Sequence, residues 1–276
     1  MRVRTVDLGD VRLEVAEAGE GGRPVLLVHG FTADKGEVAE VMAPLAARGW
    51  HVVAPDLRGH GRSDHPTPAR AYSFEILAAD VVALADDLAW DRFALVGHSM
   101  GGAVAQLVAL GSPERVTGLV LASTFHGPVK GISMELVELG CWVVRTAGMA
   151  GLADALAARR AENPASVAAF DRLQEARPGY AEQSRLRLES TSPDMWTALA
   201  PRFVAQPDRL ERLAKLDLPT AVVVGELDST MFDDCVRLAE TIPGAELTVI
   251  PGVGHVPQLE DPQAWEAAVV GFLERL

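Results

Sequence analysis

The sequence predicts an α/β domain whose mostly parallel sheet carries helices on both faces. Short unbroken apolar runs recur along the chain, and such runs are typical of strands buried on both faces of a parallel sheet. Segments with a helical spacing of apolar residues alternate with these runs, which favours strand–helix–strand units. With 276 residues, 49% of them hydrophobic and 23% charged, the chain is long enough for one large domain of this class or two small ones.

Eight segments are predicted as strands. Residues 3–8 and 11–16 alternate apolar and polar side chains around Gly9-Asp10, so we expect them to pair as a β-hairpin. The other six strands are expected in the apolar runs at residues 24–28, 51–54, 93–96, 116–121, 219–224 and 245–250. The predicted architecture is therefore an eight-stranded, mostly parallel sheet.

Helices are expected between the strands and in one long insertion. Those that alternate with strands are predicted at residues 38–48, 74–90, 103–110 and 262–276. Between residues 125 and 206 no segment has the pattern of a strand, and helices are predicted at 134–144, 151–162 and 164–176. We therefore expect a helical cap at 125–206, inserted after the sixth strand, and a core domain formed by 1–124 and 207–276.

Charge narrows the range of partners. The formal net charge of −13 and the pI near 5.0 argue against nucleic acid or an anionic membrane as a partner. Nine basic and nine acidic residues lie between positions 125 and 205, so the predicted cap is neutral. The net negative charge therefore belongs to the sheet domain.

Cysteine usage and the N-terminus indicate the compartment. The two cysteines, Cys141 and Cys235, form no disulfide framework and indicate free thiols in a reducing environment. The first residues contain no apolar signal-peptide core, and no stretch is expected to have the length and hydrophobicity of a membrane span. These features predict a cytoplasmic protein that makes no membrane contact, and they allow a homodimer.

Ser99 lies at the predicted corner between the strand at 93–96 and the helix at 103–110. Gly97 and Gly101 flank it in a G-x-S-x-G arrangement. A strand that turns sharply into a helix strains the corner residue, and a Cβ two positions to either side would collide with neighbouring elements. The arrangement is expected to present the Ser99 hydroxyl at the N-terminus of the helix.

An acid and a histidine follow two later strands. Asp228 comes just after the strand at 219–224, and His255 follows the strand at 245–250. Ligands of open α/β sheets bind beyond the carboxyl ends of the strands, where all three side chains are expected. The chain order Ser, Asp, His is the order used by folds with a serine nucleophile elbow.

The chain resembles the α/β-hydrolase superfamily, of the capped type that uses no cofactor. The resemblance rests on five segments spread over nearly the whole chain: His29-Gly30-Phe31, residues 56–63, residues 97–102, residues 225–228 and residues 254–257. It implies the α/β-hydrolase fold, a small-molecule substrate, and no cofactor or metal. Asp56 and Arg58 in the second segment correspond to residues that more often brace the fold than touch substrate.

The resemblance assigns a role to each site residue. Ser99 is the expected nucleophile, His255 the base that activates it, and Asp228 the acid that orients the imidazole. The backbone N–H groups of Phe31 and Met100 are the expected oxyanion hole. Other acids near the second strand end are rivals of Asp228 for the orienting role, namely Glu226, Asp233 and Asp234. His29 and His98 are expected to pack and form hydrogen bonds beneath the site.

Serine chemistry predicts acyl transfer through an acyl-enzyme, as in the hydrolysis of a carboxylic ester or lactone. Large apolar residues in the predicted cap indicate a small, largely hydrophobic substrate. A serine nucleophile disfavours haloalkane dehalogenases and epoxide hydrolases, which resemble the chain elsewhere. Three alternatives stay open: a C–C hydrolase of ring-fission diketones, a cofactor-free perhydrolase or haloperoxidase, and a ligand-binding protein with little turnover. The C–C hydrolases usually carry asparagine where His98 stands. The predicted substrate-binding residues are Gly30, His126, Trp142, Met195 and Trp196.

Overall fold

The computed structural model describes all 276 residues and contains one eight-stranded sheet with the order β1-β2-β4-β3-β5-β6-β7-β8. The strands are β1 (Arg2–Asp7), β2 (Arg12–Ala18), β3 (Arg23–Val28), β4 (Trp50–Pro55), β5 (Phe93–His98), β6 (Val116–Ala122), β7 (Thr220–Gly225) and β8 (Glu246–Ile250). Strand β2 pairs antiparallel with β1 and β4, and every other neighbouring pair is parallel. All eight predicted strands are confirmed.

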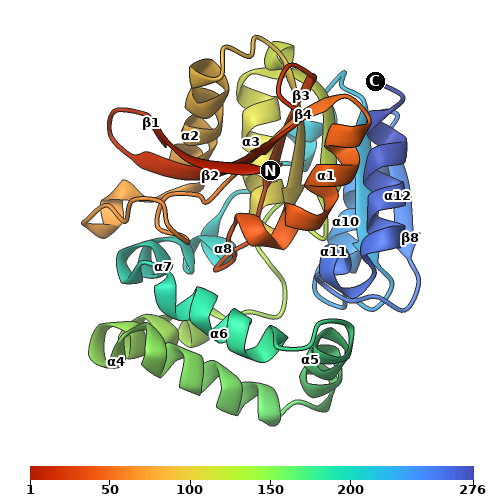
Figure 1. Ribbon diagram of the computed structural model, residues 1–276. Helices are drawn as coiled ribbons and strands as arrows, with labels where there is room; N and C mark the ends of the chain where they lie inside the picture. The colour runs from red at the N-terminus through yellow and green to blue at the C-terminus, as the bar shows by residue number, and fades with distance from the viewer.

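Helices cover both faces of the sheet (Figure 1). Helices α1 (Ala39–Ala47) and α12 (Pro262–Leu273) pack on one face, and α2 (Phe74–Asp87), α3 (Met100–Gly111) and α10 (Phe232–Thr241) pack on the other. The apolar run at residues 24–28 in strand β3 is explained by burial on both faces of the sheet. Val25 and Leu27 join the core on the α1 side, whereas Leu26 and Val28 join the core on the α2 side.

Five helices follow β6 within the insertion predicted at 125–206, and Figure 1 draws the first four of them below the sheet. They are α4 (Met134–Ala161), α5 (Pro164–Ala176), α6 (Tyr180–Ser190), α7 (Pro193–Leu199) and α8 (Arg202–Ala205). No residue of α6 is buried, so no apolar stripe marks this helix in the sequence. The remaining helical elements are short. They are α9 (Leu210–Leu213), α11 (Pro257–Glu260) and the 3₁₀ turns η1 (Lys35–Val38), η2 (Ala69–Ala71) and η3 (Pro113–Arg115). Turn η1 directly precedes α1, and the other four were not predicted.

Helix α4 occupies the region where two helices were expected. Gly148 has φ 68° and ψ −171°, which interrupts the helix between the two predicted segments. By length and composition α4 is nevertheless apolar enough to cross a membrane, with a mean hydropathy of 1.3 over 18 residues. The expectation that no stretch has these properties is therefore wrong for α4. In this structure the helix packs against α6 and α7.

A cluster of charges around Glu17 joins the outer strands β1, β2 and β4. The Glu17 carboxylate accepts hydrogen bonds from Arg4 Nε at 2.9 Å and from Arg2 Nη2 at 3.1 Å, and His51 Nε2 lies 2.7 Å from its other oxygen. Burial alone would raise the pKa of Glu17, but hydrogen bonds from Arg4, His51 and Arg2 outweigh it and lower the pKa to about 2. The carboxylate is therefore charged wherever the protein is folded near neutral pH.

Replacing Glu17 with glutamine should lower the free energy of unfolding at neutral pH. Because the pKa is lower in the folded state than its ordinary value of 4.5, the stabilising contribution is present above that value and is lost as the pH falls toward 2. We expect Glu17→Gln to cost about 1–2 kcal/mol at pH 7, less than the full shift implies because the arginine partners are partly exposed and screened.

Urea unfolding of both proteins at neutral pH and near pH 3.5 measures this difference. The exposed Glu20, which lies 3.8 Å from Arg2, provides the matched control Glu20→Gln with little expected effect. A Glu17→Gln loss of the same size at both pH values would contradict the charge assignment.

Candidate active site

Ser99 forms a strained corner between β5 and α3. Its backbone has φ 52° and ψ −116°, in the positive-φ region that residues other than glycine rarely adopt. A Cβ on Gly97 would lie 2.3 Å from the Gly101 carbonyl oxygen, and one on Gly101 would lie 2.2 Å from the Val28 carbonyl oxygen. Both glycines are therefore required by the close approach of backbone, as the motif predicts.

Ser99, His255 and Asp228 form a continuous chain of hydrogen bonds. His255 Nδ1 lies 2.9 Å from Asp228 Oδ2, and His255 Nε2 lies 3.1 Å from Ser99 Oγ. A carboxylate can only accept a hydrogen bond, so the proton of a neutral imidazole is on Nδ1 and the Ser99 hydroxyl donates to Nε2. The imidazole is thereby oriented to take the proton of the serine.

Asp228 is held in a buried, polar setting. The residue is only 2% exposed, and its Oδ1 accepts a hydrogen bond from the Met231 N–H at 3.2 Å. Burial alone would raise the pKa of Asp228, but the attraction and hydrogen bond of His255 outweigh it and lower the pKa. The carboxylate is therefore charged at neutral pH and can stabilise an imidazolium at His255.

None of the three rival acids contacts His255. Glu226 Oε2 accepts a hydrogen bond from the Gly252 N–H at 2.9 Å, and Asp234 Oδ1 lies 3.4 Å from His126 Nε2. Asp233 lies exposed on α10 and makes no ion pair. Among the acids considered, the structure brings only Asp228 into hydrogen-bonding distance of His255.

Two backbone N–H groups beside Ser99 have no acceptor in the protein. Phe31 follows the end of β3, and Met100 is the first residue of α3; neither N–H donates a hydrogen bond within the chain. The N-terminal N–H groups of a helix carry a partial positive charge, which favours an anion at this end of α3. The predicted oxyanion donors therefore lie beside the serine with their hydrogen-bonding capacity unused.

An apolar cavity of about 570 Å³ opens at Ser99 between the sheet and α4. Fifteen of its 20 lining residues are hydrophobic, and Ser99, His255 and Phe31 lie on its wall. Trp196 of α7 also lines the cavity, as expected for a substrate-binding residue. Leu136, Val137, Gly140 and Val143 supply the α4 wall from one helical face.

A smaller pocket of about 160 Å³ meets Ser99 and His255 from another side and is more polar. Gly30, predicted to contact substrate, lies on its wall. Helix α6 contributes Tyr180, Ser184 and Arg187, which lie on one face because their spacing is four and three residues. Sequence reasoning missed these three residues, since an exposed polar helix offers no apolar period to place them.

Two predicted substrate-binding residues do not reach either pocket. Trp142 is 57% exposed, because it lies about 200° around α4 from Gly140 and so points away from the cavity wall. Met195 is fully buried, and its side chain packs against Gly59 and Tyr72 in the core. The prediction that these side chains line the site is therefore wrong.

His126 is also placed differently from the prediction. Its Nδ1 lies 3.1 Å from Asp208 Oδ1, and its carbonyl accepts a hydrogen bond from the Arg209 N–H at 2.9 Å. The residue thus ties the chain that enters the helical insertion to the chain that leaves it. It is buried and lines neither pocket, so its expected contact with substrate is not supported.

Comparison with known proteins identifies relatives that match nearly the whole chain. The chain is 27% identical over 283 residues to 3-oxoadipate enol-lactonase 2 of Acinetobacter baylyi, covering 98% of this chain and 96% of that protein. It is 28% identical over 280 residues to 2-hydroxy-6-oxononadienedioate/2-hydroxy-6-oxononatrienedioate hydrolase 2 of Pseudomonas putida, covering 99% and 95%. Among solved structures, a thermophilic esterase from Thermogutta terrifontis matches with a TM-score of 0.80 at 29% identity, covering 100% and 99%.

The family assignment rests on a match of most of the chain. A family model described as the alpha/beta hydrolase fold matches residues 23–262, which include the elbow, the acid and the histidine. The strand order, the strained serine corner and the chain order of the three side chains agree with that match. The chain belongs to the α/β-hydrolase family.

Proposed function

We propose that the protein is a serine hydrolase that cleaves a carboxylic ester or lactone of a small, largely hydrophobic substrate. The observation that carries the proposal is the hydrogen-bonded chain from Asp228 through His255 to Ser99, placed at the wall of an apolar cavity. A catalytic serine needs such a base, and an apolar cavity fits a hydrophobic acyl or alcohol group. The relatives named enol-lactonase and esterase support the same reaction class.

The reaction follows from the placement of these groups. Ser99 Oγ attacks the substrate carbonyl as His255 Nε2 accepts the hydroxyl proton, and Asp228 stabilises the imidazolium. The Phe31 and Met100 N–H groups are available for the negative oxygen that develops in the transition state. His255 then protonates the leaving oxygen, and a water molecule, activated by the same imidazole, hydrolyses the acyl-enzyme.

Removal of the nucleophile should abolish ester hydrolysis without unfolding the protein. With p-nitrophenyl acetate and butyrate we expect a burst of p-nitrophenol from the wild type and none from Ser99→Ala, because the burst reports acyl-enzyme formation. A fluorophosphonate probe, located by peptide mass spectrometry, should label Ser99. Equal inertness of both proteins on a broad ester and lactone panel would contradict the proposal.

The same panel separates the alternatives that share the triad. Turnover of vinylogous diketones in preference to esters would favour C–C hydrolysis, which the Pseudomonas putida relative makes relevant. Halogenation that depends on acetate and peroxide would favour a perhydrolase. Tight binding of ester analogues with no turnover would favour a ligand-binding role. Each alternative gives a different result, namely a different product or binding without a product, so these measurements distinguish them.

Replacing Asp228 with asparagine should reduce kcat about 10⁴-fold, as the loss of the orienting carboxylate does in serine proteases. The asparagine no longer stabilises the imidazolium and no longer enforces the Nδ1–H tautomer of His255. Steady-state kinetics on p-nitrophenyl butyrate measures the effect. The exposed Asp233 on α10 gives the matched control Asp233→Asn, and equal activities of the two variants would remove Asp228 from the triad.

Narrowing the apolar cavity should shift the preferred substrate toward shorter chains. Val143 lines the cavity from α4, whereas the neighbouring Trp142 points to solvent. We expect Val143→Phe to lower the ratio of kcat/KM for decanoate over butyrate about tenfold or more, the size expected when a pocket excludes methylene groups. Trp142→Phe, the matched control, should leave this ratio unchanged. If neither substitution changes the ratio, the acyl chain of the substrate binds outside this cavity.

A further inference from the structure

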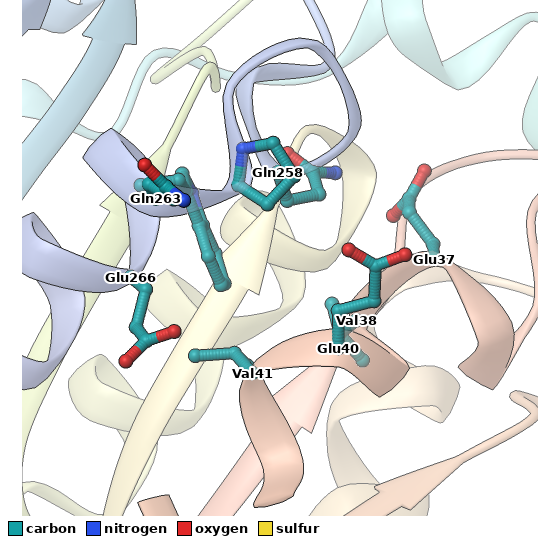
Figure 2. A pocket seen from close by; sticks show the side chains of 9 residues that line it. Glu37, Val38, Glu40, Val41, Gln258, Gln263 and Glu266 are labelled. Atoms are coloured by element: carbon teal, nitrogen blue, oxygen red, sulfur yellow. The ribbon is translucent and has the colours of Figure 1, made fainter. Parts of the chain in front are cut away.

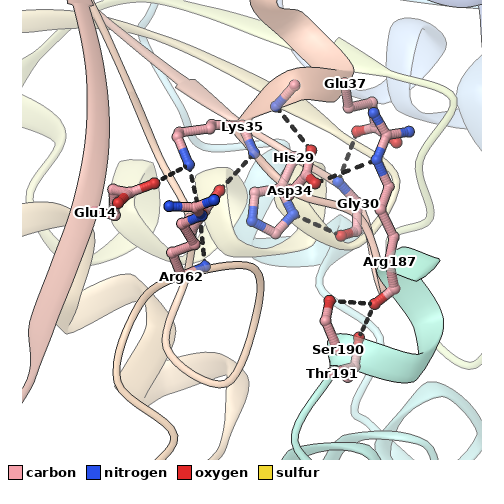
Figure 3. Close-up of polar contacts among 12 residues, drawn as sticks. Glu14, His29, Gly30, Asp34, Lys35, Glu37, Arg62, Arg187, Ser190 and Thr191 are labelled. Atoms are coloured by element: carbon pink, nitrogen blue, oxygen red, sulfur yellow. Dashed lines mark hydrogen bonds and ion pairs between the residues drawn. The ribbon is translucent and has the colours of Figure 1, made fainter. Parts of the chain in front are cut away.

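Glu37 is a buried carboxylate that the triad does not use. It lies on η1, the 3₁₀ turn that follows the Gly30-Phe31 segment. Asp34 caps this turn through the Gly36 N–H at 2.8 Å, and Lys35 Nζ lies 2.7 Å from both Glu14 and Asp56. Figure 3 shows the contact of Lys35 with Glu14 and the positions of Asp34 and Glu37. The anchored turn fixes the backbone from which Glu37 points inward.

Both partners of the Glu37 carboxylate belong to the active site. Its Oε2 accepts a hydrogen bond from the Gly30 N–H at 2.8 Å and lies 3.0 Å from Nδ1 of His98. Gly30 precedes the predicted oxyanion donor Phe31, and His98 precedes the nucleophile Ser99. One carboxylate therefore links the oxyanion turn to the elbow.

His98 extends the link to the catalytic histidine. Its Nε2 lies 2.8 Å from the backbone carbonyl oxygen of His255, while its Nδ1 faces Glu37. A backbone carbonyl and an ionised carboxylate can only accept hydrogen bonds, so with Glu37 ionised each ring nitrogen of His98 carries a proton when both bonds form. The geometry is that of an imidazolium paired with a carboxylate.

The charged and titratable groups around the pair are consistent with this state. Burial alone would lower the pKa of His98, but Glu37, the His255 carbonyl and Asp228 outweigh it and raise the pKa. Burial alone would raise the pKa of Glu37, but the attraction and hydrogen bond of His98 and the hydrogen bond from the Gly30 N–H outweigh it and lower the pKa to about 2.

Three further neighbours leave the charge balance of the pair unchanged. His29 is neutral, because its Nε2 accepts from the Leu57 N–H at 3.0 Å while its Nδ1 lies 2.7 Å from the Gly30 carbonyl. Burial raises the pKa of Tyr180, which stays uncharged, and Arg187 is paired with Asp34 at 3.2 Å.

We infer that Glu37 and His98 are positioning residues. They form a buried ion pair that fixes the Gly30-Phe31 turn and the His255 backbone in position relative to Ser99. Neither side chain is required to touch the reacting atoms. The pair acts through Gly30 on the donor at Phe31 and through the His255 carbonyl on the base. Its effect should therefore appear in kcat, where the transition state is stabilised, more than in KM.

A matched control lies one turn away. Glu37 also borders an outer pocket of about 110 Å³, which Glu40 and Glu266 line as well (Figure 2). Glu40 is half-exposed and forms a bidentate pair with Arg177, with both distances 2.5 Å. It contacts none of the groups that border Ser99, so Glu40→Gln removes a carboxylate of the same pocket without disturbing the proposed pair.

The protonation state of His98 provides a test that is independent of activity. In ¹⁵N-histidine-labelled protein at about pH 8, above the ordinary pKa of histidine, both ring nitrogens of His98 should show imidazolium shifts. The signal is assigned by its loss in His98→Gln. It should become that of a neutral ring in Glu37→Gln and stay unchanged in Glu40→Gln. A neutral His98 in the wild type would overturn the inference, even if Glu37→Gln fails to fold.

A second test measures kinetics, and it rests on the proposed ester hydrolysis. We expect Glu37→Gln to lower kcat at least about tenfold, the size of one lost hydrogen bond to a charged group, with KM changed less than about twofold. Glu40→Gln should match the wild type. Wild-type kcat in a folded Glu37→Gln protein with a neutral His98 would also overturn the inference. If the wild type hydrolyses no ester, the proposed function fails, while the spectroscopic result still decides the ion pair.

Discussion

The backbone at Ser99 is packed so closely that no side chain fits at Gly97 or Gly101, and the rest of the site depends on this approach. The N-terminus of α3 comes against the end of β3, because Gly101 lies close to the Val28 and His29 carbonyl oxygens. The positive φ of Ser99 costs conformational energy, of the order of 1–3 kcal/mol for such a residue. Hydrogen bonds from the Ser99 N–H to Ala122 and from the Thr124 hydroxyl to the Ser99 carbonyl hold the strained corner in place.

The free-energy cost of burying polar groups beside Ser99 is offset by pairing them with hydrogen-bond donors. Asp228 faces His255 and the Met231 N–H, and Glu37 faces His98 and the Gly30 N–H, so both buried carboxylates have donors. An unpaired carboxylate at either position would carry a large desolvation cost. Asp228 contacts the His255 ring, and His98 contacts the His255 backbone carbonyl. The base is therefore held at both ends.

The fold and the triad could be predicted because their determinants are local in sequence. Apolar runs identify the buried strands, and each catalytic side chain follows a strand whose end is recognisable, as for Asp228 after β7 and His255 after β8. Glu37 could not be predicted in the same way. It lies in a short polar turn, where an acidic residue is ordinarily solvated, and only the tertiary contact with His98 makes it a buried partner.

The residues that line the cavity from the helical insertion could not be predicted from composition, because large apolar side chains there lie in the core, on the cavity wall or in solvent. Trp142 and Trp196 have the same side chain, yet the turn of α4 points the first to solvent while α7 turns the second to the cavity. Met195 precedes Trp196 directly and packs into the core, because successive positions of a helix face different directions. Composition predicts an apolar pocket, but the rotation of each helix decides which residue lines it. The same holds for α6: Tyr180, Ser184 and Arg187 face the pocket at Ser99, and only the folded chain establishes that this side of the polar helix points inward.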